Sequence, residues 1–168
     1  IGTQDRDKAE RTVHTSILIA IICGILVGAA GYFLSRTMLE LMNTPDDVID
    51  KASLYLKIYF FGTPATIVYN FGSSLLRAIG DTKRPMFILI ISGIVNVIFN
   101  LIFVIVFKMD VAGVALATAL SQYISCIMIL LCLITDSDYC HLNIRKLHIY
   151  KRELMLILKI GLPAGIQG

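Results

Sequence analysis

The sequence predicts an all-α, multi-pass membrane protein, with about four complete transmembrane helices and the start of a fifth. Hydrophobic residues make up 57% of the chain, and its mean hydropathy is +0.78. The apolar residues form runs long enough to cross a bilayer, and most Lys and Arg residues lie in the connections between the runs. The formal net charge of +3 therefore gives no reason to expect binding to nucleic acid.

The first predicted span covers residues 13–34, after a polar and basic segment, residues 1–11, that is typical of a cytoplasmic loop. Small residues recur along one face of this span, at Ala20, Gly24, Gly28 and Gly31. Such a stripe allows another helix to approach closely. We interpret it as a packing surface without a ligand.

The second predicted helix begins after Thr44, which is placed to cap it, with Pro45 at the first helical position. Its first turns are polar enough to lie at the interface, and residues 55–79 form the crossing. Pro64 inside this crossing predicts a kink. One face carries Thr66, Asn70, Ser73 and Arg77. The residues alone leave two interpretations of this face open: the wall of a polar cavity, or hydrogen bonds between helices.

The third predicted span covers residues 85–107, between Gly80, which is placed to end the preceding helix, and a tight turn at residues 108–110. Pro85 fits the first turn of a helix, and no charged residue follows it within the span. At about 1.5 Å per residue the run measures roughly 35 Å, enough to cross a hydrocarbon core of about 30 Å.

Within this span, Ser92, Asn96 and Asn100 recur every four residues and share one helical face. A side-chain amide that faces lipid is costly, so we expect this face to point into a bundle or a hydrated cavity. The fourth predicted span, residues 111–134, follows a short connection and should be the antiparallel neighbour of the third. Its polar residues Thr118, Gln122 and Ser125 share a face.

Residues 135–159 are predicted to form a cytoplasmic loop, polar as far as residue 150, and then a surface-lying amphipathic helix. Residues 160–168 are predicted to begin a further span. Because the chain starts with Ile1 and stops within this apolar run, we expect it to be an internal piece of a longer chain. Basic residues cluster before the first span, between the second and third, and after the fourth, which predicts that these three segments are cytoplasmic.

Three of the four cysteines, Cys23, Cys126 and Cys132, fall inside predicted spans and are interpreted as small apolar filler. Cys140 lies next to His141 in a pair that could bind a metal, but nothing nearby completes a site. The spans gather no His, Asp, Glu or Cys side chains in a catalytic arrangement, so we do not expect an enzyme.

Several motifs, in a consistent order and orientation, resemble those of the multidrug and toxic compound extrusion (MATE) transporters. They are LLRAIGDTKRP between the second and third spans, the pair Asn96 and Asn100, GVALATALS in the fourth span, and LKIGLPAG near the end. The resemblance implies that the four spans are helices three to six of the family's twelve. Residues 1–134 would then be part of the first six-helix lobe, and residues 160–168 would start the second.

The resemblance implies a secondary transporter that exports drugs or organic cations in exchange for sodium ions or protons. In family members with a cation site in the first lobe, the matching positions are Asn96, Asn100 and Thr118, together with an aspartate of helix one that would lie upstream of Ile1. Some relatives carry an aspartate where Asn100 stands, and the amide here cannot carry a proton in the same way. Tyr55 and Asn70 match positions that line the first-lobe cavity.

The residues themselves leave two explanations open for Asn96, Asn100 and Thr118. Their neutral oxygens suit a weakly held, dehydrated monovalent cation if a carboxylate elsewhere supplies the charge, because no Asp or Glu lies inside the four predicted spans. Alternatively, the three side chains only hydrogen-bond across helices, a contribution of about 0.6 kcal/mol each on average.

An exporter in the cell membrane (the inner membrane in a Gram-negative organism) is therefore the favoured class. Its expected partners are the lipid bilayer, a small-molecule drug or organic cation, and the rest of its own chain, with no cofactor besides a sodium ion or proton for coupling. The alternative is a flippase for lipid-linked saccharides from the same superfamily. It would need a strongly cationic central cavity, for which Arg77 is the only candidate. A simple channel fits less well, because a kinked helix suits rocking bundles.

Overall fold

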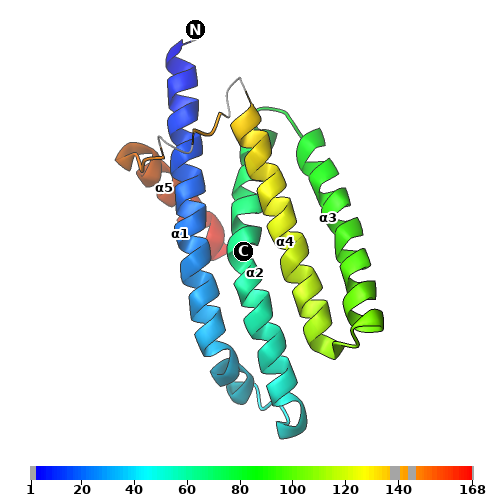
Figure 1. Cartoon of the computed structure of the whole chain (residues 1–168). Coiled ribbons are helices and arrows are strands. Elements are labelled where there is room, and N and C mark those ends of the chain that lie inside the picture. Colours follow the sequence, from blue (N-terminus) through cyan, green and yellow to red (C-terminus); the bar gives the residue numbers. More distant parts are fainter. Residues whose placement is uncertain (1–2, 137–140, 144–146, 168) are drawn as a thin grey trace.

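The computed structural model describes residues 3–136, 141–143 and 147–167. In this part of the chain, the long helices are α1 (Thr3–Leu41), α2 (Asp46–Ala78), α3 (Lys83–Leu101) with its continuation η1 (Ile102–Val106), and α4 (Asp110–Thr135). They lie side by side in the order α1, α2, α4, α3, and each runs antiparallel to the next along the chain (Figure 1). The shorter helix α5 (Lys151–Gln167) packs against α1. The predicted all-α, multi-pass architecture is confirmed.

Three of the described helical stretches are long and apolar enough to cross a membrane: Asp7–Leu41, Lys83–Val106 and Asp110–Thr135. They correspond to α1, to α3 with η1, and to α4. α2 does not reach the same hydropathy, because Thr66, Asn70 and other polar residues lie in its middle. It nevertheless lies between α1 and α4 in the bundle (Figure 1). The crossing that we expect over residues 55–79 stays a prediction.

The starts of two helices differ from the sequence-based expectation. α1 begins at Thr3, so residues 3–11 are helical and not the irregular loop that their polarity predicted; these polar residues extend the apolar helix by further turns. Thr44 does not cap α2, because Pro45 takes the capping position and no side chain bonds to the helix start. The carbonyl of Pro45 accepts the N–H of Ile49 at 3.1 Å, so helical bonding begins one residue later than predicted.

The glycine and proline signals on either side of the α2–α3 connection act as predicted. Gly80 follows the end of α2 with a φ of 87°, a left-handed conformation that glycine adopts without steric cost. Pro85 lies in the first turn of α3. The turn before α4 is tight, since Lys108 and Asp110 have φ values of 52° and 45°.

The sequence suggested one continuous α-helix for the third span, but the structure divides it into two segments. α3 ends at Leu101, and residues Ile102–Val106 form the π-helical segment η1, in which the N–H of Phe107 reaches the carbonyl of Ile102 at 3.1 Å. A π segment carries an extra residue in its turn and often marks a functional region. Nothing in the run of apolar side chains distinguishes it from an α-helix, so the pattern alone could not predict it.

The stripe of small residues on α1 lies against α2, as predicted. A Cβ atom added to Gly24 would lie 2.8 Å from Cα of Pro64, and one added to Gly28 would lie 2.8 Å from the carbonyl oxygen of Phe60. At Gly31 an added Cβ would overlap the ring of Phe60. At Gly24 and Gly28 the two helices therefore approach so closely that a larger residue would meet the backbone of α2.

The main hydrophobic core lies where α1, α2 and α4 meet, towards the start of α1. Its fully buried members include Val13, Ile17, Leu76, Ile129 and Leu133. α3 contributes little to this core, because among its described residues only Pro85, Ile88 and Ser92 are buried. Most of its apolar side chains face outward, where a bilayer would cover them.

Candidate functional site

The polar face of α3 points toward α4 and forms hydrogen bonds across the interface. The Oγ of Ser92 donates to the carbonyl of Ser121 at 2.8 Å. The Nδ2 of Asn96 lies 3.1 Å from Oγ of Ser121 and 3.5 Å from Oγ1 of Thr118. The expectation that this face points into a bundle is thus met, and Asn96 and Thr118 are brought together.

Asn100 extends this polar cluster by one turn. Its Nδ2 donates to Oδ1 of Asn96 at 3.0 Å. Its own Oδ1 is buried and, among the described residues, has no hydrogen-bond partner. A buried acceptor without a donor is costly, which makes this oxygen a candidate contact for a cation or a polar ligand.

Ser121 is the member of the cluster that the sequence analysis missed. It is 4% exposed, it accepts from Asn96, and its Oγ donates to the carbonyl of Thr118 at 2.8 Å. Its position three residues after Thr118 was a usable signal, because residues three apart share a helical face. The short turn between the two helices holds Asn96, Thr118 and Ser121 at one depth.

Gln122 and Ser125, which were predicted to share a face of α4 with Thr118, contact different partners from Thr118. Gln122 faces α2 rather than α3, and its Oε1 lies where a Cβ on Gly62 would overlap it. This oxygen is also buried and has no partner among the described residues. Ser125 donates to the carbonyl of Gln122 in its own helix at 2.8 Å. The two residues therefore do not join the Asn96 cluster.

Among the described residues, no hydrogen bond, ion pair or ring contact connects Tyr55 or Asn70 to this cluster. Asn70 is exposed on α2, and its carbonyl accepts the hydroxyl of Ser74 at 2.8 Å. Tyr55 stacks on Tyr59, with the ring centroids 6.4 Å apart. Arg77 donates to Ser73 within α2 at 3.1 Å. The polar face of α2 is thus separate from that of α3 and α4.

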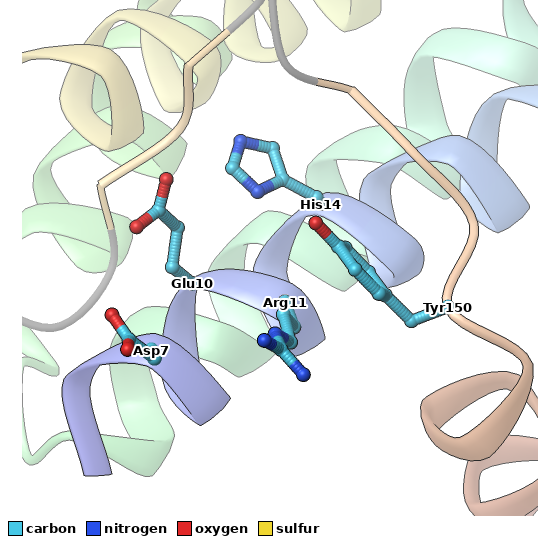
Figure 2. A pocket seen from close by; sticks show the side chains of 5 residues that line it. All are labelled: Asp7, Glu10, Arg11, His14 and Tyr150. Carbon is cyan, nitrogen blue, oxygen red and sulfur yellow. The ribbon is translucent and has the colours of Figure 1, made fainter. Parts of the chain in front are cut away.

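Several cavities lie outside the cluster. A groove of about 530 Å³ between α1, α2 and α4 is mainly apolar, and its aromatic residues are Tyr32, Phe60, Phe61 and Tyr123. A smaller polar cavity of about 250 Å³, near the start of α1, is lined by Asp7, Glu10, Arg11, His14 and Tyr150 (Figure 2).

Within the described residues, no group of three His, Cys, Asp or Glu side chains is placed to hold a metal ion. Cys140, which the sequence pairs with His141, lies outside the described residues. Cys126 is buried and Cys132 partly buried in α4, as expected for filler, whereas Cys23 is exposed on α1.

The family model described as MatE matches residues 1–102, more than half of the chain. The chain belongs to the MATE family. Among curated relatives, the probable multidrug resistance protein YpnP of Bacillus subtilis is 36% identical over 92% of this chain and 35% of that protein. The multidrug export protein MepA of Staphylococcus saprophyticus is 26% identical over 98% of this chain and 36% of that protein. The chain thus spans about a third of the length of these MATE relatives.

Solved MATE structures have the same fold as the described bundle. An outward-facing multidrug resistance MATE transporter superposes with a TM-score of 0.87, at 22% identity, over 97% of this chain and 36% of that one. An inward-facing one gives a TM-score of 0.82, at 23% identity, over 95% of this chain and 36% of that one. The helices of this chain are therefore arranged as in part of a MATE transporter, in either conformation.

Proposed function

We propose that this chain is a segment of a secondary active transporter in the cell membrane that exports drugs or organic cations in exchange for sodium ions or protons. Family membership supports this, and so do the relatives, which are named as multidrug resistance and multidrug export proteins. A membrane location follows from the apolar helices and the family. Nothing favours the alternative, a flippase for lipid-linked saccharides, and the transporter family gives no support to an enzyme.

The residues that we propose for contact with the coupling ion or substrate are Asn96, Asn100 and Thr118. The single observation that carries this proposal is the buried Oδ1 of Asn100, which has no partner among the described residues although its amide nitrogen is bonded. Residues that served only to join helices would be expected to satisfy both ends of the amide. Tyr55 and Asn70 are proposed as more distant parts of the cavity wall.

The cluster requires that the charge for ion binding comes from elsewhere. Its amide and hydroxyl oxygens are neutral, and the described spans Lys83–Val106 and Asp110–Thr135 contain no acidic residue apart from Asp110 at the helix start. Neutral oxygens bind a monovalent cation weakly unless a carboxylate joins them. We propose that such a carboxylate approaches Asn100 in the longer transporter, and that sodium or a proton on it is the coupling ion.

The test is drug efflux from cells or vesicles that contain a full-length transporter carrying this segment. Asn96→Ala and Asn100→Ala should each reduce efflux at least about fivefold, a loss on the order of 1 kcal/mol, and should shift its dependence on sodium or pH. Ser74→Ala is the matched control, because its exposed hydroxyl bonds only within α2. Efflux is normalised to the amount of transporter in the membrane.

Membrane insertion should be unaffected, since one amide between membrane helices contributes about 0.6 kcal/mol on average. Efflux that stays near normal in both Asn variants, with unchanged ion dependence, would leave these side chains as packing contacts only.

A further inference from the structure

The segment between α4 and α5 lies against α1. Leu142 is 3% exposed and packs into the main core with Val13, Ile17 and Leu133. Its N–H donates to the carbonyl of Leu133 at 2.9 Å, and Nδ1 of His141 lies 2.8 Å from the carbonyl of Asp136. These residues are therefore attached to the bundle by burial and hydrogen bonds, although they have no regular structure themselves.

Two successive side chains of α1 accept hydrogen bonds from the backbone of this segment. Nε2 of His14 accepts the N–H of Asn143 at 3.0 Å, and Oγ1 of Thr15 accepts the N–H of Tyr150 at 3.2 Å. His14 is 2% exposed and Thr15 is fully buried. Each one satisfies a backbone donor that no helix or sheet would satisfy. The ring of His14 must carry no proton on Nε2 to act in this way.

The second of these contacts lies directly before α5. The carbonyl of Tyr150 accepts the N–H of Leu154 at 2.9 Å, so Tyr150 is the residue directly before α5 and accepts its first helical hydrogen bond. The guanidinium of Arg11 lies over the Tyr150 ring, 5.2 Å from its centroid. Figure 2 shows Arg11 and His14 projecting from α1, with Tyr150 reaching toward them from the segment before α5. The attachment therefore extends to the first turn of the next helix.

We propose that residues 141–143 and 147–150 form a strap fixed to α1, with His14 and Thr15 as its anchoring residues. The strap makes the connection a part of the α1–α4 bundle. Any movement of α5 relative to that bundle then pivots at Tyr150 and not at Thr135, where α4 ends. This inference does not depend on what the protein transports.

Amide hydrogen exchange of the full chain in lipid nanodiscs tests the anchors. In the parent protein, a peptide covering the strap should exchange slowly, because its donors are bonded to buried acceptors. The double variant His14→Leu/Thr15→Val removes both acceptors at similar size and should speed this exchange at least about tenfold. The matched control His14→Gln/Thr15→Ser keeps an acceptor oxygen at both positions and should restore slow exchange.

A second variant leaves α1 unchanged, in case the double variant fails to insert. Asn143→Pro removes the donated N–H and the side chain and also fixes φ at about −65°, whereas Asn143→Ala removes the side chain alone. Spin labels on the exposed residues Lys8 and Lys151 should give a narrow distance distribution in the parent and in Asn143→Ala, and a broad one in Asn143→Pro.

Two results would overturn the strap. One is exchange in the parent peptide as fast as in an unstructured chain. The other is exchange and distances in the loss variants that match those of the parent while the α1–α4 bundle is intact. The state of the bundle is read from a second pair of labels, on Glu40 and Lys108, which lie at its other end (Figure 1).

Discussion

The interface between α3 and α4 depends on single polar atoms. The side-chain amide nitrogen of Asn96 donates to the hydroxyl of Ser121 and lies within hydrogen-bond distance of the hydroxyl of Thr118. Sequence spacing predicted that Asn96, Asn100 and Thr118 would lie together, because four-residue spacing and a short turn are local properties. It could not decide which side of the broad polar face of α4 meets α3. That depends on how the helices cross, and it is why Ser121 was missed.

At this scale we predict that Ser121→Ala weakens the bundle through Asn96. In a double-mutant cycle with Asn96→Ala, the coupling in unfolding free energy should be about 0.6 kcal/mol and at most about 1.7 kcal/mol, because unfolded membrane helices find other partners. Reversible unfolding in bicelles supplies the measurement. Ser125→Ala is the control, since Ser125 bonds within its own helix. A coupling of zero for Asn96 and Ser121 would show that their hydrogen bond makes no contribution.

At the scale of elements, α1 and α2 are held by backbone proximity. Glycines on α1 admit Pro64 and Phe60 of α2 at distances that exclude a Cβ atom. The repeat of small residues was sufficient to predict this packing face, because spacing alone places them on one side of a helix. The partner surface, which includes the proline expected to kink α2, could not be predicted without the fold.

We predict that Gly28→Ala destabilises the bundle by about 1–3 kcal/mol, because the new methyl group would meet the rigid carbonyl of Phe60 and the helices must separate. The midpoint of thermal unfolding in detergent should fall accordingly. Gly93→Ala is the matched control, since a Cβ there has nothing within 4 Å, and alanine favours a helix over glycine by roughly 0.5–1 kcal/mol. Equal effects of the two substitutions would contradict the close contact of α1 with α2.

Local sequence rules predicted some helix boundaries correctly and failed at others. Gly80 and Pro85 act as their chemistry requires, since a positive φ and a missing N–H are properties of the residue itself. The N-terminal polar segment was predicted as a loop because polarity is typical of loops, yet a long helix extends through it from Thr3. The π segment η1 has no counterpart in the pattern, because its extra residue is as apolar as its neighbours.

For the whole molecule, the two ends of the bundle carry different connections. The α1–α2 turn and the turn before α4 lie at the same end, where Lys51 and Asp110 form an ion pair at 3.1 Å (Figure 1). The connection between α2 and α3 lies at the other end, together with the start of α1. There Arg84 pairs with Asp81 and with the buried carboxylate of Asp136, each at 2.9 Å.

We predict that cysteines substituted at Asp47 and Lys108 react with an impermeant thiol reagent from outside the cell, and that a cysteine at Lys83 reacts only after the membrane is opened. The positive-inside rule places the basic end in the cytoplasm. All four native cysteines are replaced by serine beforehand, because Cys23 is exposed on α1 and Cys140 lies in the predicted cytoplasmic loop. Labelling of positions 47 and 83 from the same side would mean that α2 does not cross the membrane.

Sequence reasoning thus reached the class, the antiparallel pairing of the third and fourth spans and the main polar cluster, but not the surroundings of every predicted residue. Asn70 and Tyr55 were carried over from a family resemblance, and in the described chain neither one forms a hydrogen bond or ring contact with the cluster of Asn96. Whether they face a common cavity depends on helices packed beyond this bundle. Such long-range contacts leave no trace in local spacing.

The tight turn between η1 and α4 also affects how this chain enters the membrane during synthesis. Asn96 finds Thr118 and Ser121 within 22 and 25 residues along the chain. α3 and α4 can therefore leave the translocation channel as a closed hairpin, with the amide already paired before lipid surrounds it. An insertion that lengthens the turn would delay this pairing. It would expose Asn96 to the bilayer, where an isolated polar side chain is costly.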